Sequence, residues 1–151
     1  MPQSLARVLV HLVYSTKSRR PWLQDPALRD ELFAYSAKIL QEMDCVPILI
    51  NGEPDHVHIF CGLSRKVAIM DMVEEVKRQT SKWLKTKGPD YQDFHWQGGY
   101  GIFSVSESNS ETVRRYVAEQ ATHHAAMSYE DEFRELCRRH GLVIDERYVW
   151  E

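Results

Sequence analysis

A turn signal between two apolar runs is the feature that most constrains the fold of this chain. Asn51 and Gly52 follow the apolar residues 46–50, and a second apolar run occupies residues 56–63. An Asn-Gly pair is typical of the tight turns that join neighbouring antiparallel strands. The sequence therefore predicts a β-hairpin over this region, with a connecting loop that extends to Asp55.

The segments on either side of the hairpin carry the periodicities of two more strands and four helices. Residues 5–15 form an almost continuous apolar run, as expected for a buried strand, and residues 95–105 form a strand loosened by glycines. Pro26 suits the first position of a helix, with Asp25 as its N-cap. From the helical spacing of apolar residues we predict helices over residues 26–43, 68–85, 109–127 and 129–140.

The order of these elements predicts the fold class. Strand, helix, strand, strand, helix, strand is the split β-α-β pattern of ferredoxin-like folds. We therefore expect an α+β fold, in which an RRM-like antiparallel sheet carries helices on one face. A tyrosine-bearing helix and one further helix follow it. Because 151 residues suit one core and the chain has no repeat or composition boundary, residues 1–151 are predicted to form a single domain.

The composition is that of an ordinary soluble protein, with 43% hydrophobic and 27% charged residues. No apolar stretch approaches the length of a membrane span, and the first residues lack the pattern of a signal peptide. The cysteines, at positions 45, 61 and 137, are odd in number and widely separated, which argues against disulfides and against a cysteine-based zinc site. We expect a cytoplasmic protein with no membrane partner.

Basic residues in this chain are clustered rather than numerous. The formal net charge is −3, and residues 128–151 account for it, with seven acidic side chains against four basic ones. Clusters of Lys and Arg occur at residues 17–20, 65–66, 77–87 and 114–115. Such clusters are either a solvated surface or phosphate contacts, and the near-neutral balance is not itself a signature of a nucleic-acid binder.

Two histidines stand at alternate positions of the predicted strand over residues 56–63. Because alternate side chains of a strand share a face, His56, His58 and Phe60 point to one side of the sheet. The apolar residues between them fit a core face against the helices, so the histidines should lie on the opposite, open face. Two imidazoles so placed can bind one metal ion, although such pairs are more often structural.

A later predicted helix carries a stripe of polar side chains that suits either packing or chemistry. Tyr116, Gln120, His123 and Met127 recur at helical spacing, and the polar residues 104–110 that precede the helix suggest a mobile linker. The stripe either packs at an interface, as amphipathic helices commonly do, or brings a nucleophile to the histidine pair.

Four motifs occur in order along the chain: His11-Leu12-Val13-Tyr14-Ser15-Thr16-Lys17, Asp55-His56-Val57-His58-Ile59-Phe60, Trp96-Gln97-Gly98-Gly99-Tyr100 and Arg115-Tyr116-Val117-Ala118-Glu119-Gln120. Together they resemble the single-tyrosine HUH transposases of small bacterial insertion sequences, the IS200-like superfamily. This family includes the tyrosine transposases associated with repetitive extragenic palindromes (REP). The resemblance extends from the first strand to about residue 124, and residues 129–150 look like an extension seen in part of the family.

The resemblance implies a mechanism with one metal and one covalent intermediate. His56, His58 and Gln120 would bind a divalent cation, Mg²⁺ or Mn²⁺, and two imidazole ligands favour manganese. Tyr116 would be the nucleophile that cleaves single-stranded DNA and becomes linked to its 5′ phosphate. The implied reaction is the transposition of an insertion sequence. The sequence identifies no general base for Tyr116, and His123 is one candidate.

The resemblance also implies a DNA substrate and a homodimer. The substrate would be single-stranded DNA with a hairpin, and Trp96, Tyr100 and Phe60 would either stack on its bases or pack in the sheet. In the dimer, the tyrosine helix would reach the partner's histidine pair across residues 104–110, or close on its own. The candidate phosphate contacts are Arg19, Arg20, Lys77, Arg78, Lys82, Arg114 and Arg115.

Three other functions compete with this interpretation. A metal-dependent hydrolase could use the histidine pair with an acid such as Asp55 or Glu53 and would not need Tyr116. A non-catalytic RRM-like module would share the element order, although its aromatic motif is not evident in the sequence. A domesticated member of the same family would process palindromic repeats without moving an element.

Overall fold

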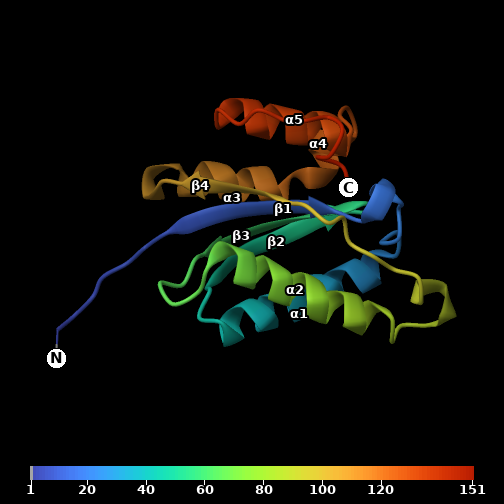
Figure 1. The fold of residues 1–151 in the computed structure, drawn as a ribbon, viewed down its shortest axis with the longest axis horizontal. Helices are drawn as coiled ribbons and strands as arrows, with labels where there is room; N and C mark the ends of the chain where they lie inside the picture. Colours follow the sequence, from blue (N-terminus) through green and yellow to red (C-terminus); the bar gives the residue numbers. More distant parts are fainter. Residues whose placement is uncertain (1) are drawn as a thin grey trace.

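The sheet at the centre of the molecule has four antiparallel strands in the order β2-β3-β1-β4 (Figure 1). In the computed structural model, which describes residues 2–151, the strands are β1 (Leu9–Ser15), β2 (Pro47–Glu53), β3 (His56–Gly62) and β4 (Gly101–Val105). β1 and β3, the most completely buried strands, occupy the two central positions. This is the strand order of a ferredoxin-like α+β fold, and the predicted fold class is confirmed.

Two of the predicted strands are shorter than expected. The first begins at Leu9 rather than residue 5, because its partner β3 ends opposite Leu9, at Gly62. The fourth begins at Gly101 rather than residue 95. Before it, Trp96 forms only an isolated bridge with Thr16.

The β2–β3 hairpin is confirmed, but its turn lies further along the chain than predicted. Asn51 pairs with His58 and Gly52 pairs with Val57, so both residues lie within the ladder, and Pro54 and Asp55 form the turn. A Cβ atom on Gly52 would lie 2.3 Å from the His56 carbonyl oxygen. The glycine is therefore needed for close approach of the two strands, and the expected turn at Asn-Gly is wrong.

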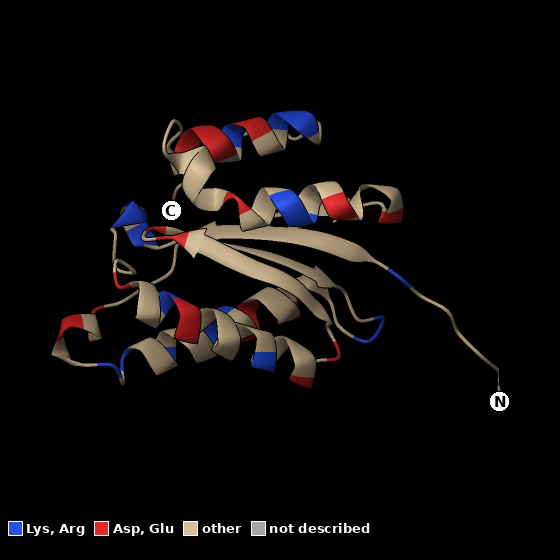
Figure 2. Ribbon diagram, turned by 180° about the vertical axis from the view of Figure 1, so that it is seen from behind, with Lys and Arg blue, Asp and Glu red and all other residues tan. Residues whose placement is uncertain are grey.

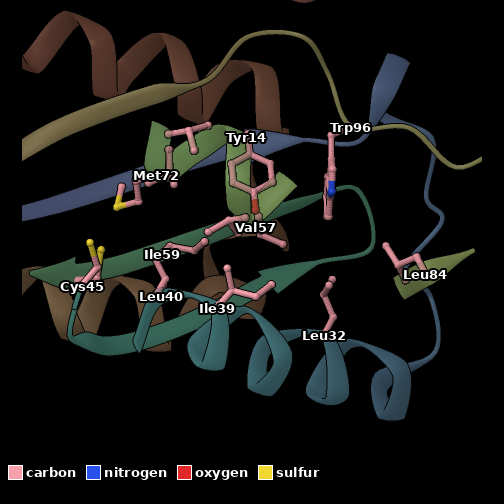
Figure 3. Close-up of a cluster of buried hydrophobic side chains, with 14 of the residues drawn as sticks. Tyr14, Leu32, Ile39, Leu40, Cys45, Val57, Ile59, Met72, Leu84 and Trp96 are labelled. Carbon is pink, nitrogen blue, oxygen red and sulfur yellow. The ribbon is translucent and has the colours of Figure 1, made fainter. Parts of the chain in front are cut away.

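Helices α1 (Pro26–Glu42) and α2 (Ile69–Leu84) cover one face of the sheet, as predicted (Figure 1). The Asp25 side chain caps α1 by accepting a hydrogen bond from the Ala27 amide. Figure 3 shows the core between these helices and the sheet. Its buried side chains include Tyr14, Leu32, Ile39, Leu40, Val57, Ile59, Met72 and Trp96.

The other face of the sheet is covered as well, by α3 (Ser110–Ala118), α4 (Gln120–His124) and α5 (Tyr129–Arg139) (Figures 1 and 2). The expectation of an open face is therefore wrong. The reason is that α5 buries an apolar stripe of its own against this side, with Phe103 of β4 in the same cluster. The predicted helix over residues 129–140 is confirmed.

The predicted helix over residues 109–127 is broken into α3 and α4 at Glu119. Glu119 has a φ of −99° and a ψ of 28°, outside the helical range. Across the break, the Asn51 side-chain amide donates hydrogen bonds to the carbonyls of Val117 and Ala118, at 3.0 and 3.2 Å. In a continuous helix these two carbonyls would accept hydrogen bonds from backbone amides further along the helix. Because Asn51 of β2 donates to them instead, the helix breaks here.

The connection into α3 is ordered, in contrast to the mobile linker expected over residues 104–110. The first two of these residues belong to β4, and the 3₁₀ helix η3 (Glu107–Asn109) follows Ser106. Glu107 also forms an ion pair with Arg7. The remaining 3₁₀ helices are η1 (Lys17–Arg19) and η2 (Pro89–Tyr91).

None of the helices within residues 2–151 has both the length and the apolar character that a membrane span requires. The assignment of residues 1–151 to a single domain stays a prediction.

Candidate active site

His56 and His58 lie on the sheet face that carries α3, α4 and α5, as the strand alternation predicts. Val57 and Ile59 face the core on the other side, and Phe60 packs beside Val117 of α3. Both histidines are 0% exposed. The pair is therefore a buried feature between two layers rather than a site on an open sheet.

Four side chains converge on one point between β3 and the covering helices. The Nε2 atoms of His58 and His124 each lie 2.9 Å from Oε1 of Glu132, and Nε2 of His56 lies 3.4 Å from it. One possible ligand atom from each of these residues lies within 4.8 Å of all the others. Such a buried cluster of three imidazoles and a carboxylate could bind a metal ion.

The second ring nitrogen of each histidine is held by a neighbour. His56 Nδ1 lies 2.7 Å from Oδ1 of Asp55, and His58 Nδ1 lies 2.8 Å from Nε2 of His11. His124 Nδ1 lies 2.7 Å from the carbonyl oxygen of Met127. These contacts orient all three rings so that Nε2 points into the cluster, which is how outer partners orient metal-binding imidazoles.

Gln120 lies beside the histidine pair, as the predicted stripe suggests. Its Oε1 is 3.2 Å from Nε2 of His56, and its Nε2 is 3.3 Å from Oε2 of Glu132. The side chain is completely buried at the start of α4. Its amide oxygen is therefore available to a cation at this position.

Tyr116 lies at the edge of the same cluster. Its hydroxyl donates a hydrogen bond to Oε2 of Glu132. Its ring stacks on His123, with 4.4 Å between the ring centroids, and meets His11 and His58 edge-on at 6.0 Å. His123 thus contacts the face of the ring rather than the hydroxyl. The expected nucleophile and the expected metal ligands are brought together within one chain.

A pocket of about 440 Å³ opens beside this tyrosine. Its lining includes Tyr116, His123 and Glu132, together with Arg139 of α5. The pocket connects the solvent with the tyrosine and with Glu132, which itself contacts the three imidazoles. A substrate phosphate could therefore approach the cluster from this side.

The charges of the cluster are strongly coupled. Burial lowers the pKa of His58 to about 4. Burial alone would lower the pKa of His56 too, but hydrogen bonds to the carboxylates of Asp55 and Glu132 outweigh it and raise that pKa to about 9. Burial would raise the pKa of Glu132, yet hydrogen bonds from the three histidines hold it far below its usual range. An ionised Glu132 is thus stabilised by the surrounding imidazoles.

The same carboxylate affects the phenol. Burial and the contact with Glu132 both raise the pKa of Tyr116 above its ordinary value, and Arg139 acts weakly in the opposite direction. In this arrangement Tyr116 is a neutral hydrogen-bond donor. Arg114 and Arg115, which are close to Tyr116 in sequence, are exposed and are not among the main groups that shift this pKa.

Glu132 and His124 are the members of the cluster that the sequence interpretation missed. A usable signal for Glu132 was present, since it stands on the apolar stripe of α5 with Tyr129, Phe133 and Leu136. A lone acid among buried apolar positions indicates a buried partner. His124 has no comparable signal, because its place in the site depends on the break between α3 and α4.

The expected DNA-contacting residues fall into two groups. Arg20, Arg78, Lys82, Arg114 and Arg115 are exposed. Arg19 is partly buried and donates to the Trp150 carbonyl, and Lys77 donates to the carbonyls of Gln97 and Gly99 at 2.8 and 2.7 Å. Figure 2 shows that Lys and Arg positions occur on both helical layers.

Two of the three aromatic residues expected to pack or to stack on bases are core residues. Phe60 is fully buried beneath α3, and Trp96 packs edge-on against Tyr14 and Phe94. Stacking on bases is therefore excluded for these two in this conformation, and only Tyr100 is partly exposed.

The structure also bears on two rival interpretations. An RRM-like module binds nucleic acid on its free sheet face, and here α3, α4 and α5 cover that face. A hydrolase built from the histidine pair and Asp55 is not supported, because Asp55 contacts His56 from the side away from the cluster.

Comparison with known proteins identifies the family. The family described as "Transposase IS200 like" matches residues 4–120, which include Tyr116, Gln120 and the histidine pair. The chain belongs to the IS200-like transposase family. A relative, the ISDra2 transposase TnpA of Deinococcus radiodurans, is 25% identical over 115 residues, covering 73% of this chain and 81% of the relative. The resemblance inferred from the motifs is confirmed, and the chain is a transposase-family enzyme.

Two solved structures share the fold. A transposase from Deinococcus radiodurans superposes with a TM-score of 0.62 at 21% identity, covering 80% of this chain and 95% of that one. The REP-associated tyrosine transposase bound to a REP hairpin superposes with a TM-score of 0.61 at 12% identity, covering 84% and 74%.

Proposed function

We propose that this transposase is a metal-dependent endonuclease and strand transferase for single-stranded DNA, which acts through a 5′-phosphotyrosine intermediate and moves an insertion sequence. One observation carries the proposal. The hydroxyl of Tyr116 and the Nε2 atoms of His56 and His58 meet at the two oxygens of the same buried carboxylate, Glu132. A nucleophile and a pair of imidazole ligands within one cluster suit phosphoryl transfer.

His56, His58 and Gln120 are the residues that we propose as ligands of a divalent cation. These residues suit a cation site, because both imidazoles present Nε2 to the cluster and the Gln120 oxygen lies 3.2 Å from His56 Nε2. When bound, the cation would polarise the scissile phosphate and offset its developing charge. Two imidazole ligands favour Mn²⁺ over Mg²⁺ on ligand preference.

Tyr116 performs the covalent step in this proposal. Its oxygen forms a bond to phosphorus while the bond from phosphorus to the 3′ oxygen breaks, which leaves a 5′-phosphotyrosine and a free 3′ hydroxyl. The phenol loses its proton and the departing 3′ oxygen gains one, so no high-energy cofactor is consumed. Reversal by a different 3′ hydroxyl would join new strands.

The proposed substrate is single-stranded DNA that contains a hairpin. The structural neighbour that holds a REP hairpin supports this choice by analogy of fold. The exposed basic side chains that could contact phosphates are Arg20, Arg78, Lys82, Arg114 and Arg115. Arg19 and Lys77 would have to give up their present hydrogen-bond partners to do so. We also propose a homodimer, because one tyrosine per chain permits one covalent strand at a time.

The experiment that tests the proposal incubates the protein with single-stranded hairpin DNA and Mn²⁺, followed by denaturing gel analysis. The parent chain is expected to form a protein–DNA adduct. Tyr116→Phe should abolish both cleavage and adduct while hairpin binding persists. His58→Ala should remove the cleavage that depends on Mn²⁺, and excess chelator should have the same effect on the parent.

Two outcomes would contradict the proposal. Continued cleavage by Tyr116→Phe without an adduct would indicate a metal-dependent hydrolase instead. Undiminished cleavage by His58→Ala in chelator would exclude the metal. Arg65→Gln is a matched control, since this exposed residue lies at the far end of β3 from the cluster and its loss should leave adduct formation unchanged.

A further inference from the structure

Two side chains at the centre of the site come from outside the part of the chain that defines the family. The family match ends at Gln120, whereas His124 lies at the end of α4 and Glu132 lies on α5. Glu132 is nevertheless only 1% exposed and contacts the proposed nucleophile directly. The segment after the family match thus contributes to the chemistry of the cluster.

The two oxygens of Glu132 have separate sets of partners. Oε1 lies 2.9 Å from Nε2 of both His58 and His124, and 3.4 Å from that of His56. Oε2 accepts hydrogen bonds from the Tyr116 hydroxyl and, at 3.3 Å, from the Gln120 amide. One oxygen therefore faces the imidazoles, and the other faces the nucleophile.

The charge of this carboxylate has no ordinary partner. Within residues 2–151, its ion-pair contacts are with histidines alone, and no Lys or Arg nitrogen lies within 4.0 Å of it. A buried carboxylate is costly unless a positive charge accompanies it. The countercharge must come from the imidazoles or from a cation that they bind.

Counting donors and acceptors shows what each source requires: an imidazole that faces an acceptor at both nitrogens must carry a second proton unless a cation is bound. His124 faces the Met127 carbonyl at Nδ1 and Glu132 at Nε2, and His56 faces Asp55 at Nδ1 and Glu132 at Nε2. A neutral imidazole has a single N–H and can satisfy one acceptor only. A cation bound to the Nε2 lone pairs and to the Glu132 carboxylate would satisfy all of these contacts while the imidazole rings stay neutral.

We propose that His124 and Glu132 are ligands of the same divalent cation as His56 and His58, and that the second oxygen of Glu132 positions the Tyr116 hydroxyl beside that cation. The inference rests on the metal of the proposed function and deepens it. A set of three imidazoles and a carboxylate selects a transition-metal ion such as Mn²⁺ more strongly than two imidazoles and an amide do. Glu132 links the metal site and the nucleophile through one side chain.

Calorimetric titration of the whole protein with Mn²⁺, without DNA, tests the ligand assignment independently of activity. Glu132→Gln keeps the shape of the side chain and removes its charge, and His124→Gln removes one imidazole. Each should weaken Mn²⁺ binding at least tenfold. Glu135→Gln is the matched control on the same helix, because within residues 2–151 Glu135 pairs only with Arg138 and Arg139. This variant should bind Mn²⁺ within twofold of the parent.

The outcomes separate this inference from the proposed function. In one outcome the parent binds Mn²⁺, His58→Ala does not, and Glu132→Gln and His124→Gln bind it as tightly as the parent. The assignment of Glu132 and His124 as ligands would then be wrong, and the metal site of the proposed function would stand. If the parent binds neither Mn²⁺ nor Mg²⁺, the metal of the proposed function fails together with this inference. Circular dichroism checks each fold, and His124→Gln carries the test if Glu132→Gln does not fold.

A double-mutant cycle tests the positioning role of Glu132. Urea unfolding of the metal-free parent, Glu132→Gln, Tyr116→Phe and the double variant gives the coupling between the two side chains. Non-additive changes in the free energy of unfolding are expected, because Glu132→Gln removes the charge that strengthens this hydrogen bond and Tyr116→Phe removes the bond itself. Additive changes would show that Glu132 does not hold the Tyr116 hydroxyl.

Discussion

At the scale of single residues, the protonation state of each imidazole is decided by its burial and by the charges that it contacts. His58 is held at Nδ1 by another imidazole, that of His11, and the pKa of His11 is itself lowered well below its ordinary value, mainly by burial. His56 is held by the carboxylate of Asp55 instead. The two histidines of one motif thus have opposite preferences for a proton, although they stand two positions apart on one strand.

This difference predicts how the stability of the metal-free protein depends on pH. Burial lowers the pKa of His58 from 6.5 to about 4, so the unfolded chain binds a proton that the folded chain rejects, and stability falls as pH drops through this range. The contacts of His56 with Asp55 and Glu132 overcome burial and raise its pKa to about 9, so its contribution is lost as pH rises through 9. Each unmatched proton changes the free energy of unfolding by about 1.4 kcal/mol per pH unit.

Urea unfolding in chelator between pH 4 and 9.5 measures this profile. We expect a maximum near neutral pH and a shallower acid limb in His58→Gln. His95→Gln, at an exposed histidine, should reproduce the parent profile. An acid limb of equal slope in the parent and in His58→Gln would refute the assignment.

At the scale of elements, the β2–β3 hairpin positions the histidine pair, and the pairing of its strands depends on Gly52. Asn51 pairs with His58 on this ladder and also holds the end of α3 through Val117 and Ala118. One hairpin therefore carries the expected metal ligands and terminates the helix that bears the tyrosine.

Gly52→Ala is expected to disturb both stability and metal binding. The added Cβ would lie 2.3 Å from the backbone oxygen of His56 and 3.0 Å from Cα of Val57, so the two strands must separate. We expect a loss of about 1–3 kcal/mol in the free energy of unfolding and weaker Mn²⁺ binding. Gly62→Ala, at the other end of β3, meets nothing closer than 3.9 Å and should cost less than about 1 kcal/mol. Equal effects of the two changes on unfolding would contradict this account.

At the scale of the whole molecule, the sheet lies between two helical layers that serve different purposes. The α1 and α2 layer encloses the main apolar core, and the α3, α4 and α5 layer encloses the polar cluster (Figures 1 and 3). The second layer is attached through the ordered segment after β4, and α5 is held by Tyr129, Phe133 and Leu136. The structure of one chain thus contains both halves of the candidate site.

This arrangement predicts the result of mixing two inactive variants. Tyr116→Phe keeps the histidine pair, His58→Ala keeps the nucleophile, and exchange of tyrosine helices between chains would restore activity. We expect no protein–DNA adduct from the equimolar mixture, because the short connection around Ser106 gives α3 little reach. Adduct formation by the mixture would instead establish sites shared between two chains.

The sequence determined the parts of this protein that depend on local periodicity. Alternation along residues 56–63 assigned His56 and His58 to one face of the sheet, and helical spacing made neighbours of Tyr116 and Gln120. The order of strands and helices identified the ferredoxin-like fold, and the ordered motifs identified the family. These inferences hold because side-chain direction repeats every two residues in a strand and every 3.6 in a helix.

Only the tertiary structure decided where the turn, the helix break and the full cluster lie. The turn at Pro54 and Asp55 follows from cross-strand pairing, and the break at Glu119 coincides with donors from a distant strand. Glu132 meets His58 across 74 positions of sequence, and no local pattern encodes a contact of that separation. Packing of α5 on the second sheet face creates that contact, because the apolar stripe of α5 is buried there against Val13 and Phe103.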